Sequence, residues 1–488
     1  MKTVSTDRSG GFGLHISERA CLAILTFLGL AQVGVYSRIL LLDDLGLRIG
    51  EYVALFLLCF ILYMLSVVIV ARLHARSTFP RSRLLFTVLL FSVVFRIIMI
   101  PLKPGLTHDF MRFLWDGRLL TNGVNPYLYR PDAPELDAFK NVPYFADYEF
   151  KHTFTVYPPV AQLLFAGTYI LAGDNPVGTK ITVSVIDVVN TLLIAILLKE
   201  VKGGTQLPGI LMYAWSPLLV VESAGNAHME PLVTLFILLS LHSLQRNRFR
   251  LSSLNFSLAC WSKLYPILLL PVYLKLLKDS GGRGLKDFTL VFLSSSALIL
   301  APVFISSGWN LLSQVFWYSQ NITYNGSAFT LLDAVLGSWN TGRLLASILV
   351  YSAFLASLIG VLRMRRLRSL LDFSHVSIMV YGAFLLFASS VFQWYLLWIL
   401  PFIAIRGLYM VSIPWLYLSG AVVLAYLPQF SLSYDPVAFR LIEYAPLYLL
   451  VSLSILIEEN PLVKPYRLKS SGLKGSVDWD EDHCRQET

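Results

Sequence analysis

Long runs of apolar residues recur along the chain, and they constrain its fold more than any other feature. The first three occupy residues 20–42, 51–71 and 84–101. A helix needs about 20 residues to cross the hydrocarbon core of a bilayer, and these runs are of that length. They are also continuous, whereas the strands of a membrane β-barrel alternate between apolar and polar residues. The chain is therefore predicted to be an all-α polytopic membrane protein.

The composition agrees with a membrane protein and argues against a protein that binds nucleic acid. Of the 488 residues, 56% are hydrophobic and 14% are charged, whereas soluble domains have about 25% charged residues. The formal net charge is +9, but Lys and Arg gather at the ends of apolar runs, as the positive-inside rule describes. We therefore expect membrane lipid around the chain and no nucleic-acid partner.

Basic segments set the predicted topology. Residues 71–83, 246–250 and 363–368 are rich in Arg and are placed in the cytoplasm. The third apolar run then leads outward, so that residues 102–157 form an extracytoplasmic loop. Four apolar runs follow before the second basic segment, and four crossings would leave that segment on the wrong side. The run at 160–172 is the shortest, about 20 Å as a helix, and is expected to be re-entrant or interfacial.

The rest of the chain is predicted to pass repeatedly through the membrane. Both ends of 251–277 are basic, so this segment is expected to be a hairpin of short helices with Lys263 near its tip. The total is roughly 12 to 14 transmembrane or re-entrant helices. The predicted regions are a cytoplasmic N-terminus (1–19), three helices (20–101), the catalytic loop (102–157), the remaining helices with outer loops at 222–230 and 306–342 (158–457), and a cytoplasmic polar tail (458–488).

The first outer loop contains a dense group of polar and aromatic residues. Its segment HDFMRFLWDGR places Asp109, Arg112 and Asp116 on one face if it is helical. A carboxylate beside a guanidinium in a partly dry cleft suits a general base with an Arg that holds a phosphate. An interfacial helix with an internal salt bridge explains the same pattern. Tyr157, just before a proline-led helix start, either binds substrate or belongs to the aromatic belt.

A second group of ionisable residues lies between two later apolar runs. Glu222, His228 and Glu230 occur in ESAGNAHME, and ionisable groups at membrane depth are costly and usually functional. They can hydrogen-bond to a sugar or its phosphate, and a capped, solvated loop is the alternative. His228 and Glu230 stand two residues apart, which matches no helical metal-ligand spacing. No metal site is predicted.

Three further residues complete the candidate site. Lys263 is a lone cation in the apolar hairpin, where it either neutralises a phosphate or extends to the membrane surface. Trp394 and Tyr395 either stack on a sugar or lie at the level of the headgroups. With the topology above, all these polar groups lie near the extracytoplasmic face.

Several motifs are missing from the sequence. It contains no P-loop, no GxGxxG dinucleotide fingerprint, no CxxC and no GxSxG elbow. We therefore expect no cofactor, and an enzyme of this kind must take an activated substrate from the lipid itself.

Five segments occur in an order that resembles one enzyme superfamily. They are HDFMRFLWDGRLLTNGVNPYLYRP, TVYPPVAQ, WSPLLVVESAGNAHMEPL, SKLYPILLLP and QWYLLWILPF. Over residues 100–410 the chain resembles the GT-C superfamily of integral-membrane glycosyltransferases, in particular the bacterial polyprenyl-phosphate-mannose-dependent mannosyltransferases. The resemblance implies an inverting transferase of the bacterial inner membrane, with its active site on the extracytoplasmic face. It implies a polyprenyl-phosphate donor of a hexose, mannose, and a lipid-linked or cell-envelope glycan acceptor.

The resemblance also implies roles for single residues. Asp109 matches the catalytic Asp of the family and is expected to be the general base. At 228–230 the chain has His-Met-Glu where relatives often have His-Asn-Asp, so the role of Glu230 stays open. Arg112 and Lys263 are expected to bind the phosphate, and His228 and Tyr157 to contact the donor or the acceptor. Asp116 is expected to orient Arg112 or to bind the acceptor. The other expected substrate-binding residues are Glu230, Trp394 and Tyr395.

Other enzymes and transporters that handle lipid phosphates remain as alternatives. These are a lipid-linked oligosaccharide ligase, a polymerase or a flippase. A flippase would line a continuous path across the bilayer with polar groups, whereas the polar groups predicted here gather near one face.

Overall fold

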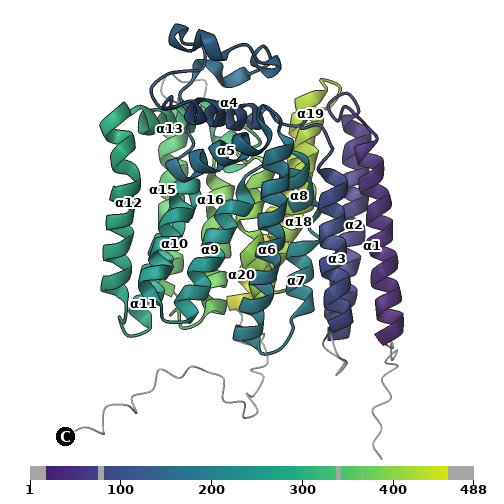
Figure 1. Ribbon diagram of the computed structural model, residues 1–488. Coiled ribbons are helices and arrows are strands. Elements are labelled where there is room, and N and C mark those ends of the chain that lie inside the picture. Colours follow the sequence, from purple (N-terminus) through teal and green to yellow (C-terminus); the bar gives the residue numbers. More distant parts are fainter. Residues whose placement is uncertain (1–17, 75–81, 337–341, 365, 460–488) are drawn as a thin grey trace, which may run out of the picture.

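The computed structural model is a bundle of membrane-length helices (Figure 1). Within the described residues, ten helices are long and apolar enough to cross a membrane, and three shorter apolar helices accompany them. In the part of the chain that is described, the only strand-like pairing is a pair of isolated bridges to Ser390. The predicted all-α polytopic class is therefore confirmed. The described residues are 18–74, 82–336, 342–364 and 366–459.

Some of the predicted cytoplasmic segments lie outside these residues. They include most of the N-terminus at 1–19, most of the basic segment at 71–83, and nearly all of the tail at 458–488.

Three long helices form one side of the bundle (Figure 1). The first and third of them pack closely, because Gly29 has no Cβ; a Cβ at this position would clash with the ring of Phe91. These helices are α1 (Glu18–Leu40), α2 (Ile49–His74) and α3 (Ser82–Met99).

The predicted catalytic loop lies at one end of the bundle (Figure 1). Its helix α4 (Asp109–Thr121) packs on α5 (Pro159–Ala172), and Gly117 permits this close approach to the backbone of Phe165. The fourteen residues of α5 reach about 20 Å, too short to cross a bilayer. Three 3-10 turns follow α4: η1 (Pro134–Phe139), η2 (Pro143–Phe145) and η3 (Glu149–His152).

The next helices form the interior of the bundle, and the segment from α7 to η4 is almost wholly buried. The expected outer loop at 222–230 is also fully buried, so it is not a solvated loop. The reason is that the helix breaks at Ser216 and again at a π-turn, which keeps its polar residues inside the bundle. These elements are α6 (Val177–Lys202), α7 (Leu207–Ala214), α8 (Pro217–Val220), the π-turn η4 (Val221–Gly225) and α9 (Glu230–Gln245).

A buried ion pair joins helices α3, α6 and α7. Arg96 of α3 donates to Asp187 of α6 through Nε at 2.8 Å, and their side chains are 2% and 0% exposed. Tyr213 of α7 donates to the other oxygen of Asp187 at 2.7 Å, and Arg96 also donates to the carbonyl of Ala214 at 3.0 Å. A carboxylate and a guanidinium at this depth are tolerated because each has several partners.

The predicted hairpin after the second basic segment is present, with its turn inside the bundle. The expected outer loop at 306–342, of which residues 337–341 lie outside the described residues, holds two short helices. The first of these helices buries Leu311 and Gln314 and exposes Phe316. The polar residues of the segment made this helix hard to recognise in the sequence. These elements are α10 (Phe249–Ser262), η5 (Tyr265–Leu269), α11 (Leu270–Asp279), α12 (Leu285–Ser307), α13 (Asn310–Asn321) and α14 (Ala328–Leu336).

The C-terminal part adds two long helices at its ends and a broken, mostly buried middle. Prolines in the first turns of its short helices explain the interruptions. The elements are α15 (Gly342–Met364), α16 (Leu370–Phe387), η6 (Gln393–Trp398), α17 (Leu400–Arg406), η7 (Met410–Ser412), α18 (Ile413–Ala421), η8 (Val422–Ala425), α19 (Tyr426–Phe430) and α20 (Pro436–Glu459).

Removing the carboxylate of the buried ion pair should destabilise the bundle. Asp187→Ala leaves the charge of Arg96 buried and unpaired, so we expect a loss of about 3–5 kcal/mol of stability, measured by thermal unfolding in detergent. Asp287→Ala is the control, because Asp287 pairs with Arg250 at 3.3 Å with both side chains largely exposed. Its effect should stay below about 1 kcal/mol. Equal changes for the two variants would contradict a structural role for the buried pair.

Candidate active site

Asp109 is the first residue of α4, at the end of the bundle. Its backbone N–H donates to Oγ1 of Thr107 at 3.2 Å, and its carboxylate accepts from the hydroxyl of Tyr157 at 3.2 Å. The side chain is half-buried: protein surrounds it, yet part of its surface stays accessible. Burial raises the pKa of Asp109 above the ordinary carboxyl value. Such a carboxylate is a stronger base than one in water.

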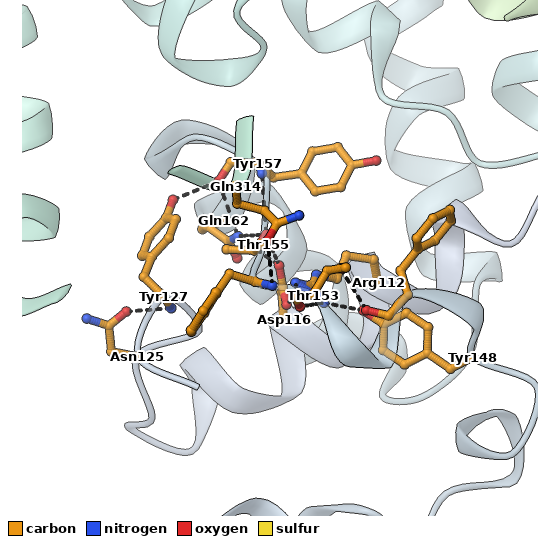
Figure 2. A network of polar contacts seen from close by, with 12 residues as sticks. Arg112, Asp116, Asn125, Tyr127, Tyr148, Thr153, Thr155, Tyr157, Gln162 and Gln314 are labelled. Atoms are coloured by element: carbon orange, nitrogen blue, oxygen red, sulfur yellow. Dashed lines mark hydrogen bonds and ion pairs between the residues drawn. The ribbon is translucent and has the colours of Figure 1, made fainter. Parts of the chain in front are cut away.

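Tyr157 is fixed from several sides. Its ring packs edge-on against Phe113 of α4 and Phe165 of α5, with ring centroids 5.1 and 5.3 Å away. Its carbonyl accepts from the hydroxyl of Tyr127 at 2.8 Å, as Figure 2 shows. The two prolines that follow Tyr157 start α5, so the chain leaves the site at once.

Lys263 and Glu230 form an ion pair close to Asp109. Glu230 begins α9 and is fully buried, and Lys263 follows the end of α10 in an extended conformation. The ammonium of Lys263 donates to Oε1 of Glu230, while Oε2 of Glu230 has no partner among the described residues. The charge of Lys263 lowers the pKa of Asp109 and that of Glu230 raises it, although burial has the larger effect. The three ionisable groups therefore share one electrostatic environment.

Arg112 and Asp116 face a different network, shown in Figure 2. Arg112 pairs with Asp116 at 3.3 Å and donates to the hydroxyl of Tyr148 at 2.5 Å and to the carbonyl of Thr153 at 3.0 Å. Its side chain is 6% exposed. The guanidinium is thus occupied by the protein, and its contacts hold the outer loop to α4.

The carboxylate of Asp116 has further partners in this network. It accepts from Thr155 at 2.6 Å and from Gln162 at 2.9 Å. Asp116 is fully enclosed, so its contacts join α4 to the segment that leads into α5.

His228 and Trp394 stack on each other inside the bundle. Their ring centroids are 3.8 Å apart, and Phe392 stacks on the same indole at 4.8 Å. Two rings this close to one indole cannot share a face, so Trp394 lies between them. Trp394 consequently has no free face for a sugar, contrary to our expectation. His228 lies within electrostatic reach of Lys263.

Tyr395 joins the site together with a residue that the sequence did not single out. It stacks on Trp398 at 4.1 Å and lies near Tyr318 of α13. Both tyrosines lie within electrostatic reach of Asp109. Tyr318 was missed because its segment was expected to be a loop.

The structure thus places most of the predicted residues around one centre. Arg112 and Asp116 lie apart, bound to each other and to the outer loop. Tyr157 contacts Asp109, and Glu230, Lys263 and Tyr395 lie within electrostatic reach of it. His228 lies within reach of Lys263 and stacks on Trp394.

Comparisons with known proteins place this site in a family. The sequence model described as "Alpha-(1->6)-mannopyranosyltransferase, N-terminal domain" matches residues 22–278, more than half of the 488 residues. The match includes Asp109, Tyr157 and Lys263. No curated protein matches the chain.

One solved structure is similar in overall arrangement. It is ArnT from Cupriavidus metallidurans, bound to undecaprenyl phosphate, with 12% sequence identity over 77% of each chain and a TM-score of 0.44. A likeness at this level carries no statement about the activity of this chain.

The family match covers the helices that carry Asp109, Glu230 and Lys263. It confirms the expected glycosyltransferase activity and the resemblance to mannosyltransferases. The chain belongs to the alpha-(1->6)-mannopyranosyltransferase family.

Proposed function

We propose that this membrane glycosyltransferase moves a mannose from a polyprenyl-phosphate donor to a lipid-linked or cell-envelope acceptor, with Asp109 as the general base. The observation that supports this most directly is the position of Asp109. Its carboxylate is half-buried, is held by Tyr157, and lies within electrostatic reach of the Lys263–Glu230 pair. A base and a cation that share one electrostatic environment suit the transfer of a sugar from a phosphate.

The reaction is an inverting displacement. Asp109 takes the proton from an acceptor hydroxyl, whose oxygen attacks the anomeric carbon of the donor. The bond from that carbon to the phosphate oxygen breaks, and the lipid phosphate leaves with the electron pair. Because the family makes α-(1→6) linkages, inversion requires a donor with a β-linked sugar. The acceptor must present a primary 6-hydroxyl.

Lys263 is proposed to offset the charge of the departing phosphate. Its ammonium has three N–H donors, and the Glu230 contact uses one of them. Arg112, the other cation considered, is assigned to hold the outer loop, because Asp116, Tyr148 and Thr153 already occupy its guanidinium.

The donor is proposed to come from the bilayer, on the extracytoplasmic side. The sequence has no nucleotide-binding motif, and the site lies at one end of a bundle of apolar helices. Helix α9 leads from Glu230 to the basic segment 246–250, which the positive-inside rule favours in the cytoplasm. These features together favour an inner-membrane enzyme with an outward-facing site.

Asp109→Asn should nearly abolish transfer. The amide cannot accept the proton, so we expect kcat to fall about 10²–10⁴-fold. The assay uses purified protein, polyprenyl-phosphate mannose and glycolipids that end in a hexose with a free 6-hydroxyl. Asp174→Asn is the control: Asp174 pairs with Arg118 at 2.5 Å at the same end of the bundle and should leave kcat unchanged.

Three outcomes would count against this proposal. Near-normal turnover by Asp109→Asn would remove Asp109 as the base. Elongation of a 6-deoxy acceptor would exclude the 1→6 linkage. Movement of the lipid donor across the bilayer without a new glycosidic bond would favour a flippase instead.

The pH dependence should reflect the environment of Asp109. Its base form is lost as the pH falls through a pKa that burial holds above the ordinary value, so activity should decline at a higher pH than an exposed Asp would give. Lys263→Met removes a charge that lowers this pKa and should move the acidic limb of kcat/KM to higher pH. Glu230→Gln removes a charge that raises it and should move the limb to lower pH. Shifts in the same direction would contradict the proposed electrostatics.

A further inference from the structure

Glu222 is a buried carboxylate in the middle of the bundle that the proposed reaction does not use. It lies in the π-turn η4, and its side chain is fully buried. The hydroxyl of Tyr426 donates to its Oε1 at 3.0 Å, and Nδ2 of Asn226 donates to its Oε2 at 3.2 Å. Both oxygens of Glu222 therefore act as acceptors. Burying a carboxylate is costly, and ionisable groups at membrane depth are usually functional.

The backbone around Glu222 is shaped to bring it to His228. The π-turn lets the N–H of His228 bond to the carbonyl of Glu222 at 2.9 Å, and Ala227 between them has φ +67°. A positive φ at a residue with a Cβ is strained, and π-turns occur frequently at functional sites. The result is that Nε2 of His228 lies 3.4 Å from Oε2 of Glu222.

The ring of His228 cannot move freely from this position. It stacks on Trp394, which in turn stacks on Phe392, and Phe392 stacks on Tyr324 at 4.6 Å. This column of four rings fixes the plane of the imidazole. Among the described residues, neither its Nδ1 nor its Nε2 makes a hydrogen bond, and Nε2 has only the 3.4 Å contact with Glu222.

A neutral imidazole carries its proton on one nitrogen and a lone pair on the other. An ionised carboxylate only accepts hydrogen bonds, so Glu222 in its ionised form favours the proton on Nε2. The lone pair is then on Nδ1, which has neither a hydrogen bond nor an ion-pair contact among the described residues. A buried acceptor left unpaired is unfavourable, and a hydroxyl of a bound sugar is the kind of group that would pair with it.

We propose that Glu222 is a positioning residue: it sets the tautomer of His228, so that Nδ1 accepts a hydrogen bond from a sugar hydroxyl of the substrate. This inference rests on the proposed transfer reaction for its kinetic consequences. The tautomer itself is a property of the free protein and is measured without any substrate.

The first experiment measures the tautomer directly. The protein labelled with ¹⁵N-histidine is studied by NMR, and the His228 signals are assigned by their loss in His228→Asn. We expect an unprotonated Nδ1 and a protonated Nε2 in the wild type. In Glu222→Gln, the amide oxygen keeps Tyr426 and the NH₂ group faces Nε2, so the proton should move to Nδ1. A proton on Nδ1 in the wild type, or no change in Glu222→Gln, would overturn the proposal.

The second experiment separates this role from a general effect on packing. Glu222→Gln should lower kcat/KM about ten- to hundredfold, as expected for one lost hydrogen bond to a buried group. Asn at position 228 places its amide oxygen near the position of Nδ1 without needing Glu222. In the His228→Asn background, Glu222→Gln should therefore have little further effect. The same fold-loss in both backgrounds would show that Glu222 does not act through His228.

Glu443→Gln is the matched control for burying an amide in place of a carboxylate. Glu443 of α20 is equally buried and accepts from Nδ2 of Asn325 at 2.8 Å, and this variant should keep wild-type kcat/KM. If wild-type protein transfers sugar while Glu222→Gln matches it, this proposal fails and the transfer reaction stands. If wild-type protein transfers no sugar, the reaction fails, and the NMR result still decides the tautomer.

Discussion

Charge inside an apolar bundle requires a partner, and this requirement organises the whole structure. Arg96 and Asp187 satisfy each other between α3 and α6 and are completely enclosed. Lys263 and Glu230 are also paired, but one oxygen of Glu230 has no partner in the part of the chain that the structure describes. Asp109 differs from all of them, because its direct partner is a neutral tyrosine and it stays partly accessible. The Arg96–Asp187 pair holds helices together. The incompletely paired groups at Glu230 and Asp109 leave hydrogen-bonding capacity for a ligand.

Much of the fold was predictable because length and apolarity are local properties. The long runs became α1 to α3, and the run at 160–172 became a helix too short to cross. Interrupted helices were harder to predict. Residues 222–230 were polar enough to suggest an exposed loop, and only the packing of surrounding helices shows that they are enclosed. Sequence periodicity says nothing about whether a broken helix ends inside a bundle.

The site was predictable to the extent that its residues are chemically conspicuous in an apolar chain. Asp109, Glu230 and Lys263 come together as charged groups in such segments tend to do. The partners of Arg112 were not predictable, since Tyr148 and Thr153 lie about forty residues away in a loop without periodicity. Aromatic residues misled in a similar way, because Trp394 stacks on protein rings on both faces.

The network around Arg112 orders part of the site before substrate binds. Residues 153–157 are tied down by Arg112 at Thr153, by Asp116 at Thr155 and by Tyr127 at Tyr157. Ordering one residue of a free chain costs about 1–2 kcal/mol, and here that ordering takes place during folding. The hydroxyl of Tyr157 is consequently in place beside Asp109 before any substrate arrives. The binding energy of the substrates is then available for orienting them, an effect known as preorganisation.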